Sequence, residues 1–273
     1  MGTGLDVART LQNCSENYMK DFTLKIYSEL LAALQMAGYE TKSISDFVSA
    51  QQSAGQYTVI LRHDVDKSPG NALKMAKIEH DAGINGTYYF RTVKESFDPD
   101  IIRAINGMGH ETAYHYEDLS VCNGDFEKAI QSFQTNLERI KCICPVSTIS
   151  MHGSPWSKYD NRDLWQRYDY KKYGIKAEAY LDIDYTSILY LTDSGRTWAD
   201  IKANLRDRVQ SDIQVPVRTT VDIINMLRTK KLPETIIITL HPQRWHNNRI
   251  LWISEWCIQK IKNLIKPILI KWR

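Results

Sequence analysis

Two aspartates separated by a single residue follow an apolar segment. The segment 57–61 (YTVIL) is β-branched and apolar, as expected of a buried strand, and it leads into Asp64 and Asp66. Side chains alternate along a strand, so both carboxylates point to the same side if the extended path continues. Two like charges on one face repel each other unless a cation or a shared proton separates them. The pattern fits either a solvated strand end before the turn at Pro69-Gly70 or a site that holds a cation.

Polar residues also end several later segments that are expected to be strands. These residues can bind a metal, transfer a proton or orient a group that does so: His115, His152, Asp193 and His241. In a parallel βα barrel the carboxyl ends of the strands converge on one face, where active sites form. We therefore predict that the four residues share one site with Asp64 and Asp66.

These residue types could hydrolyse an amide. Asp66, His115 and a further imidazole offer oxygen and nitrogen ligands, and a catalytic zinc typically has three protein ligands and a water whose pKa it lowers. Asp64 could take a proton from that water as general base. His241 could donate a proton to the leaving amine, and Asp193 could orient its imidazole.

Alternating strand and helix patterns would position these side chains. Helices are predicted at 16–37, 70–82, 99–107, 124–140, 218–229 and 250–265, and strands at 57–66, 85–91, 110–115, 147–153, 176–183, 188–193 and 235–241. This alternation is typical of parallel βα units, and no repeat or Pro/Gly-rich linker interrupts it. We predict an α/β protein in which residues 1–15 are a flexible N-terminus and residues 16–273 form one barrel domain with an N-terminal helix.

The composition narrows the class of protein. The apolar share of 43% and the charged share of 25% are ordinary for a globular enzyme, and the net charge of +3 is too small to indicate a nucleic-acid partner. The five cysteines show no CxxC pairing of the zinc-binding kind and are interpreted as reduced thiols. Residues 1–20 contain no apolar signal core, and no apolar run approaches the length of a transmembrane span. These features predict a cytoplasmic protein without a transmembrane segment.

The segments LRHDVD, GTYYF, GMGHETAYH and TLH resemble the polysaccharide deacetylase family, also called the NodB-homology or carbohydrate esterase 4 family. The resemblance runs from about residue 57 to about residue 245. It implies a distorted, TIM-like (β/α)7 barrel that removes N-acetyl groups from amino sugars with a metal. In the family's first motif one Asp is the base and the next a metal ligand, which correspond to Asp64 and Asp66. The family's first metal histidine falls on His115, and its general acid on His241.

One position departs from the family's pattern. The family usually has a second metal histidine four residues after the first, where this chain has Leu119, and leucine cannot bind a metal. The segment 150–161 (SMHGSPWSKYDN) replaces an arginine-bearing family segment and brings His152 to the predicted face. His152 is therefore either the substitute ligand or a substrate contact beside Ser154 and Trp156. The implied cofactor is a divalent metal, with zinc favoured. A metal with only two protein ligands and a site without metal are the other possibilities.

Basic and aromatic residues near the strand ends could bind a carbohydrate or nucleotide-sugar substrate. Arg244 could grip a carboxylate or phosphate, and Trp245 could stack on a sugar ring. The alternative is a loop packed by Trp245, with Arg244 in solvent. The other candidate substrate contacts are Trp156, Tyr159, Arg196 and Trp198.

Three functions remain open from the sequence. We favour a hydrolase that removes an acetyl or formyl group from an amino sugar in surface-polysaccharide biosynthesis. Leu119 favours a metal-poor or metal-free amidase that acts on a non-polymeric C–N bond. A non-catalytic glycan-binding barrel would need neither a base nor an acid, so Asp64 and His241 together count against it.

The last twelve residues, 262–273 (KNLIKPILIKWR), alternate basic and apolar side chains. Such a segment could contact an anionic membrane surface. The interpretation that we favour is a helix that covers the base of the barrel and leaves its lysines in solvent.

Overall fold

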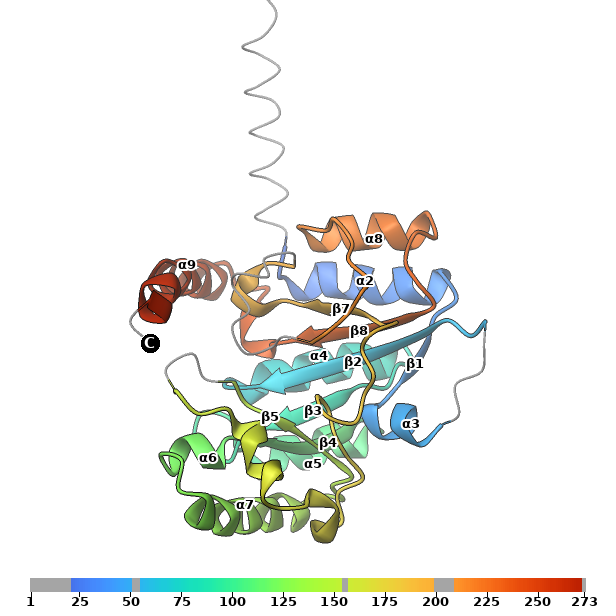
Figure 1. The fold of residues 1–273 in the computed structure, drawn as a ribbon. Helices are drawn as coiled ribbons and strands as arrows, with labels where there is room; N and C mark the ends of the chain where they lie inside the picture. The colour runs from blue at the N-terminus through green and yellow to red at the C-terminus, as the bar shows by residue number, and fades with distance from the viewer. Residues whose placement is uncertain (1–20, 51–54, 154–156, 199–208, 272–273) are drawn as a thin grey trace, which may run out of the picture.

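A curled sheet of parallel strands forms the centre of the molecule (Figure 1). The structure is a computed structural model, and it describes residues 21–50, 55–153, 157–198 and 209–271. Along the sheet the strands follow the order β6-β5-β4-β3-β2-β8-β7, and β1 pairs with the beginning of β2. Their bounds are β1 Glu40–Lys42, β2 Thr58–Val65, β3 Thr87–Phe90, β4 Glu111–Tyr116, β5 Thr148–Met151, β6 Ala177–Glu178, β7 Leu189–Thr192 and β8 Thr235–Leu240.

The predicted distorted (β/α)7 barrel is confirmed in the form of a curled half-barrel. Each strand pair within the described residues is parallel. Among those residues no ladder joins β6 to β7, the two ends of the sheet, so hydrogen bonds do not close the barrel. The predicted flexible N-terminus, residues 1–15, lies outside the described part of the chain.

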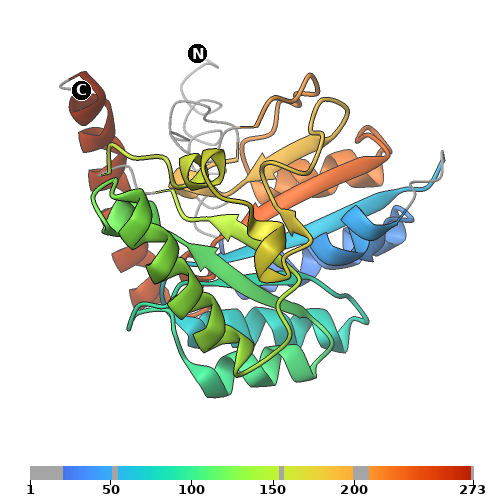
Figure 2. The ribbon, with the colours of Figure 1, turned by 60° about the horizontal axis from the view of Figure 1, so that its bottom comes forward.

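Helices cover the convex side of the sheet and its two ends. α2 and α8 pack together beside β7 and β8, α4 and α5 lie behind the middle strands, and α7 covers the region of β4 (Figures 1 and 2). The helical bounds are α2 Leu24–Met36, α3 Ile44–Ser49, α4 Pro69–Asp81, α5 Pro99–Gly107, α6 Asp118–Val121, α7 Phe126–Lys141, α8 Thr220–Arg228 and α9 Arg249–Lys271, with short 3₁₀ turns η1 Asn161–Gln166, η2 Tyr170–Tyr173, η3 Ser194–Arg196 and η4 Pro242–Arg244.

Local sequence explains where several helices begin. In each case a side-chain oxygen accepts a hydrogen bond from a free backbone N–H in the first turn, which stabilises a helix by about 1 kcal/mol. The capping residues are Thr23 for α2, Ser43 for α3, Asp98 for α5, Asp125 for α7 and Thr219 for α8. The bounds of α5 are those predicted from the sequence.

The strand predicted at 176–183 is wrong beyond its first residues. β6 ends at Glu178, whose carboxylate accepts hydrogen bonds from the backbone N–H groups of Tyr180 at 2.7 Å and Leu181 at 3.0 Å. Because a side chain takes these donors, they are not available to a ladder, and the chain turns.

The strand ends share one feature that builds the site. The residue directly after each of β2, β3, β4, β5, β7 and β8 is charged or carries an imidazole: Asp66, Arg91, Glu117, His152, Asp193 and His241, respectively. Parallel strands bring these residues to one edge of the sheet.

Candidate active site

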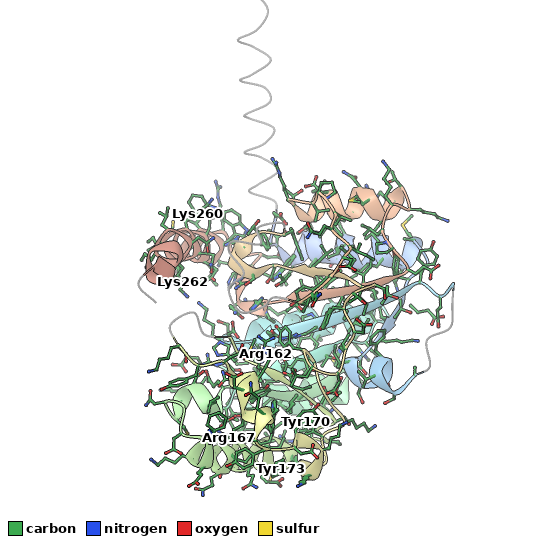
Figure 3. All side chains as sticks on the ribbon, in the orientation of Figure 1. Arg162, Arg167, Tyr170, Tyr173, Lys260 and Lys262 are labelled. Atoms are coloured by element: carbon green, nitrogen blue, oxygen red, sulfur yellow. The ribbon has the colours of Figure 1, made fainter. Side chains whose placement is uncertain are left out.

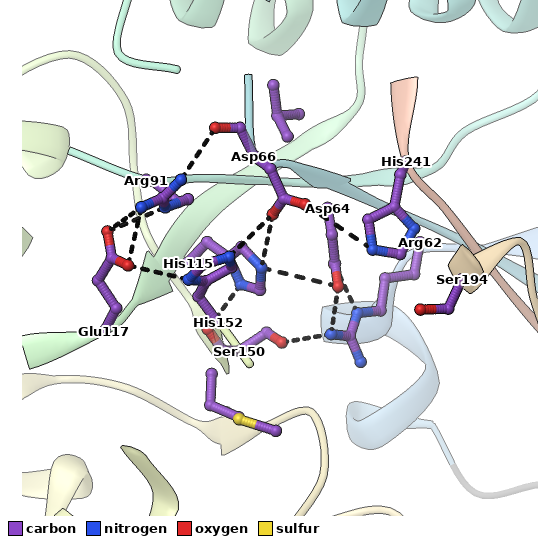
Figure 4. Close-up of polar contacts among 12 residues, drawn as sticks. Arg62, Asp64, Asp66, Arg91, His115, Glu117, Ser150, His152, Ser194 and His241 are labelled. Atoms are coloured by element: carbon purple, nitrogen blue, oxygen red, sulfur yellow. Dashed lines mark hydrogen bonds and ion pairs between the residues drawn. The ribbon is translucent and has the colours of Figure 1, made fainter. Parts of the chain in front are cut away.

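Asp64 is an ionised carboxylate held by an arginine of the same strand. Arg62 donates from Nε to Asp64 Oδ1 at 2.8 Å and from Nη2 to Oδ2 at 2.7 Å (Figure 4). The same guanidinium donates to Ser150 Oγ at 2.6 Å, which links β2 to β5. Burial opposes ionisation, but the Arg62 charge and its hydrogen bonds lower the pKa of Asp64. The carboxylate is therefore ionised and fixed in orientation.

Asp66 has one satisfied and one unsatisfied oxygen. Oδ2 accepts a hydrogen bond from Gln243 Nε2 at 2.9 Å, whereas the buried Oδ1 has no hydrogen-bond partner among the described residues. Two imidazole nitrogens face Oδ1, His152 Nε2 at 3.5 Å and His115 Nε2 at 3.6 Å (Figure 4). Although burial opposes the charge, the surrounding histidines hold the pKa of Asp66 well below its usual range. A buried anionic oxygen without a donor requires a cation or a proton beside it.

The other ring nitrogen of each histidine fixes the tautomer. His115 Nδ1 lies 3.0 Å from the carbonyl oxygen of Ser150, which can only accept, so Nδ1 carries a proton. His152 Nδ1 lies 2.9 Å from Glu117 Oε2. Burial raises the pKa of Glu117, but His152 and Arg91 outweigh that effect and keep it ionised. When each ring is neutral, its Nε2 presents a lone pair toward Asp66 Oδ1.

The spacing of Asp66 Oδ1 and the two imidazole nitrogens is close to the spacing of ligands around one metal ion. With metal–ligand bonds of about 2.0–2.1 Å, two ligands of a tetrahedral ion lie about 3.4 Å apart. The two separations at Asp66 Oδ1, 3.5 and 3.6 Å, are close to that value. Within the described residues no group of three or more His, Cys, Asp or Glu side chains is placed so that it could hold a metal ion as it stands. Glu117 and the Ser150 carbonyl are outer partners of the kind that orient metal-binding histidines.

Leu119, where the family pattern has a histidine, lies on α6 and is buried in the apolar core. His152 instead reaches Asp66 from the end of the neighbouring strand β5. The predicted convergence of the two residues is therefore found, and their separation permits shared coordination.

His241 and Asp193 form a buried pair on the other side of Asp66. His241 Nδ1 lies 2.6 Å from Asp193 Oδ1, and the His241 backbone N–H donates to Oδ2 at 3.0 Å. Burial and Arg244 each lower the pKa of His241, but the carboxylates of Asp193 and Asp66 outweigh them and raise it. The Nε2 atom faces Asp66 Oδ2 at 4.0 Å. The raised pKa favours the protonated form of His241.

Two of the predicted substrate contacts support Asp193 instead. Arg244 Nη1 donates to Asp193 Oδ1 at 2.6 Å, and Trp245 Nε1 donates to Oδ2 at 2.8 Å. Trp245 is fully buried, and Trp198 is nearly so and donates to Thr220 Oγ1. The sugar stacking predicted for Trp245 therefore has no open ring face, and Trp198, the other predicted contact, also belongs to the core.

The remaining predicted substrate contacts are Arg196, Tyr159 and Trp156. Arg196 is buried, donates to the backbone oxygen of Trp252 and lines a pocket of about 180 Å³ between η3 and α9. Tyr159 is half-buried and packs against the core. Trp156 and Ser154 lie outside the described residues.

Sequence reasoning missed Arg62, Arg91, Glu117 and Gln243. Arg62 had a usable signal, because a residue two positions before Asp64 shares its side of the strand. Arg91 and Glu117 directly follow strands, so the search for polar residues at the ends of strands could also have found them. No comparable signal marks Gln243, which comes from a short turn after β8.

No family model matches the chain, and no curated protein matches it. Solved structures do match. A carbohydrate esterase family 4 pseudoenzyme from Bacillus anthracis is 12% identical over 78% of this chain and 63% of that one, with a TM-score of 0.40. The catalytic domain of a peptidoglycan N-acetylglucosamine deacetylase from Eubacterium rectale is 13% identical over 79% and 90%, with a TM-score of 0.42. A family 4 carbohydrate esterase from Bacillus subtilis is 14% identical over 84% and 82%, with a TM-score of 0.41.

Two of these matched proteins are described as members of carbohydrate esterase family 4, the family that the motifs resemble. The chain spans less than two thirds of the first matched protein. Because the TM-scores are below 0.5, the chemistry of the site is derived from the chain's own residues.

Proposed function

We propose that this protein is a metal-dependent hydrolase that removes an acetyl or formyl group from the nitrogen of an amino sugar. The observation that carries the proposal is Asp66 Oδ1, a buried carboxylate oxygen that faces the Nε2 atoms of His115 and His152 without a hydrogen bond. A base, Asp64, and an acid, His241, stand beside it. The amino-sugar substrate and a role in surface-polysaccharide biosynthesis rest on the sequence resemblance, and the predicted cytoplasmic location rests on the sequence.

Asp66, His115 and His152 would hold the metal, and this donor set of nitrogen and oxygen favours zinc. The metal would supply positive charge that polarises the acyl oxygen and lowers the pKa of the attacking water. Every other part of the reaction falls to side chains of the chain itself.

Asp64, oriented by Arg62, takes a proton as the water oxygen bonds to the acyl carbon. The C–N bond then breaks, and His241 Nε2 gives its proton to the departing amine. Asp193 stabilises the imidazolium until that transfer, and Arg244 and Trp245 fix Asp193 in place. The products are a carboxylic acid and a free amino sugar.

A second function, a metal-free amidase, is favoured by a specific contact. His115 Nε2 lies 3.7 Å from Asp64 Oδ2 and 3.6 Å from Asp66 Oδ1, so a protonated ring would pair with two carboxylates. A proton would then do the work of the metal in separating the two anions.

A hydrolysis screen tests the proposed function. Acetate or formate release is measured from N-acetyl and N-formyl amino sugars, free and nucleotide-linked, before and after chelation and zinc return. Asp64→Asn should slow turnover by about 100-fold or more, the low end for acid–base catalysis, because the base is lost. The matched control is His80→Ala, a histidine on the exposed side of α4. Turnover that survives Asp64→Asn unchanged contradicts the mechanism, and turnover that is indifferent to chelation supports the metal-free amidase.

A further inference from the structure

The C-terminal helix α9 turns its apolar side away from the rest of the protein. The side that faces the protein carries Trp252, Glu255 and Gln259, which are 5–8% exposed. The opposite side carries large apolar residues that are 39–78% exposed: Ile250, Leu251, Ile253, Ile258, Ile261, Leu264 and Ile265. A helix that only covers its own domain is expected to show the reverse distribution.

Polar contacts hold α9 in this orientation. Glu255 Oε2 pairs with Lys67 Nζ at 3.2 Å, and Asn263 Nδ2 donates to the backbone oxygen of Gly195 at 2.9 Å. Trp252 Nε1 donates to the backbone oxygen of Asp21 at 2.7 Å. A rotation of the helix that buried its isoleucines would break all three contacts. The apolar side therefore needs a cover from outside the described fold.

Charge indicates what that cover is. Residues 249–271 contain one arginine, four lysines and a single acidic residue, Glu255, which lies on the inward side and is already paired. Lys260 and Lys262 are exposed and leave the helix on opposite sides of it (Figure 3). An apolar stripe bordered by lysines suits the boundary between anionic headgroups and acyl chains, where the stems lie in the apolar layer and the ammonium groups in water. A second copy of the same helix would bring like charges together.

We propose that α9 binds in the plane of an anionic membrane, with its isoleucine side in the acyl layer and Lys260 and Lys262 among the headgroups. Within the described residues, the chain has no helix that is long and apolar enough to cross a bilayer. The inference concerns a helix that lies on the surface, and it does not depend on the proposed hydrolysis.

Vesicle sedimentation of the full chain tests this inference. The vesicles consist of phosphatidylcholine alone or of an equal mixture of phosphatidylcholine and phosphatidylglycerol. We expect the protein to sediment with the mixed vesicles and much less with the neutral ones. Lys260→Glu should weaken binding to the mixed vesicles by about fivefold or more, because each basic residue near an anionic surface contributes on that scale.

The decisive variant carries Ile258→Glu and Ile261→Glu, whose native side chains are 41% and 57% exposed. It should not sediment, whereas Met36→Glu, at an apolar residue of α2 that is 83% exposed, should behave as wild type. Circular dichroism checks that the variants are folded. Equal binding to both kinds of vesicle, or none, overturns the inference. So does a dimer in solution that the double variant converts to a monomer, because the cover would then be a second copy.

Discussion

The protons on Nδ1 of His115 and of His152 determine what Asp66 Oδ1 can bind. The Ser150 carbonyl and the Glu117 carboxylate keep the Nδ1 protons of His115 and His152, so both Nε2 lone pairs are directed at one carboxylate oxygen. A metal ion would remove the repulsion between these lone pairs, because the carboxylate oxygen and both Nε2 atoms would bind to it. A proton on Nε2 would also separate that nitrogen from the carboxylate oxygen, but the imidazole would then be positively charged.

Metal content therefore separates the two states. We expect purified protein to bind about one zinc ion per chain and to melt at a higher temperature with zinc than after chelation, because a ligand of the folded state stabilises it. Asp66→Ala and His115→Ala should bind no zinc, and zinc should not raise their melting temperatures. His80→Ala should behave as wild type in both measurements. His152→Ala decides the role left open by the sequence: loss of metal makes it a ligand, and retained metal makes it a substrate contact. Zinc retained by Asp66→Ala would refute the assignment.

The pH dependence of turnover tests how Asp193 and Arg244 change the pKa of His241. As the acid, His241 must be protonated, so the rate falls as pH rises through its raised pKa. Asp193→Asn removes a charge that raises this pKa and should move the alkaline limb to lower pH. Arg244→Gln removes an opposing charge and should move the same limb to higher pH. Shifts of the same sign in both variants would show that His241 is not the titrating acid.

Residue spacing predicted the candidate site residues better than the side chains that hydrogen-bond to them. Alternation and the strand-end rule brought Asp66, His115 and His152 together correctly. The sequence left two alternatives for Trp245, sugar stacking and packing, because aromatic residues beside a site suit a sugar and a core equally well. The outcome depended on Asp193, whose oxygen needed the indole N–H.

At the scale of elements, periodicity located most strands and helices, and it failed where a side chain competes with the backbone. β6 is the example, because Glu178 takes the N–H groups that would have extended it. β1 and α3 escaped prediction because segments of three and six residues are too short to show a period.

The start of β3 is packed against a buried polar group on the side of the sheet that carries α4. A Cβ added at Gly86 would lie 3.0 Å from Glu79 Oε2 and 3.2 Å from the Leu61 backbone oxygen. Gly86→Ala should therefore lower the free energy of unfolding by about 1–3 kcal/mol, as overpacking does. Gly107→Ala, at a helical position with open space, should leave it unchanged or raise it slightly. Urea unfolding measures both, and equal effects would contradict this account of β3.

At the scale of the whole molecule, the two proposed surfaces lie at the same edge. α9 packs against η3 and η4, the turns that directly follow β7 and β8, and Figure 1 shows it at the edge toward which the strand arrows point. The helix itself was predicted, but its place at the base of the barrel was wrong. Hydrophobic periodicity predicts that the helix has an apolar and a polar side, but it does not predict which side packs against the protein. Here the side with Glu255, Gln259 and Asn263 packs inward, and its partners Lys67 and Gly195 are distant in the sequence.

A membrane under α9 would bring the mouth of the site to the lipid surface. If both proposals hold, a sugar carried on a lipid anchor in anionic vesicles should be hydrolysed with a kcat/KM about tenfold or more above that of the same sugar free in solution, because attachment raises the effective concentration of one for the other. The sugar is the one identified by the hydrolysis screen. The variant with Ile258→Glu and Ile261→Glu should lose this preference and keep the hydrolysis of the free sugar, since neither residue belongs to the candidate active site. A preference that survives in the variant would show that α9 does not hold the mouth at the membrane. Hydrolysis of neither form by wild type would instead count against the proposed function, so the two failures can be told apart.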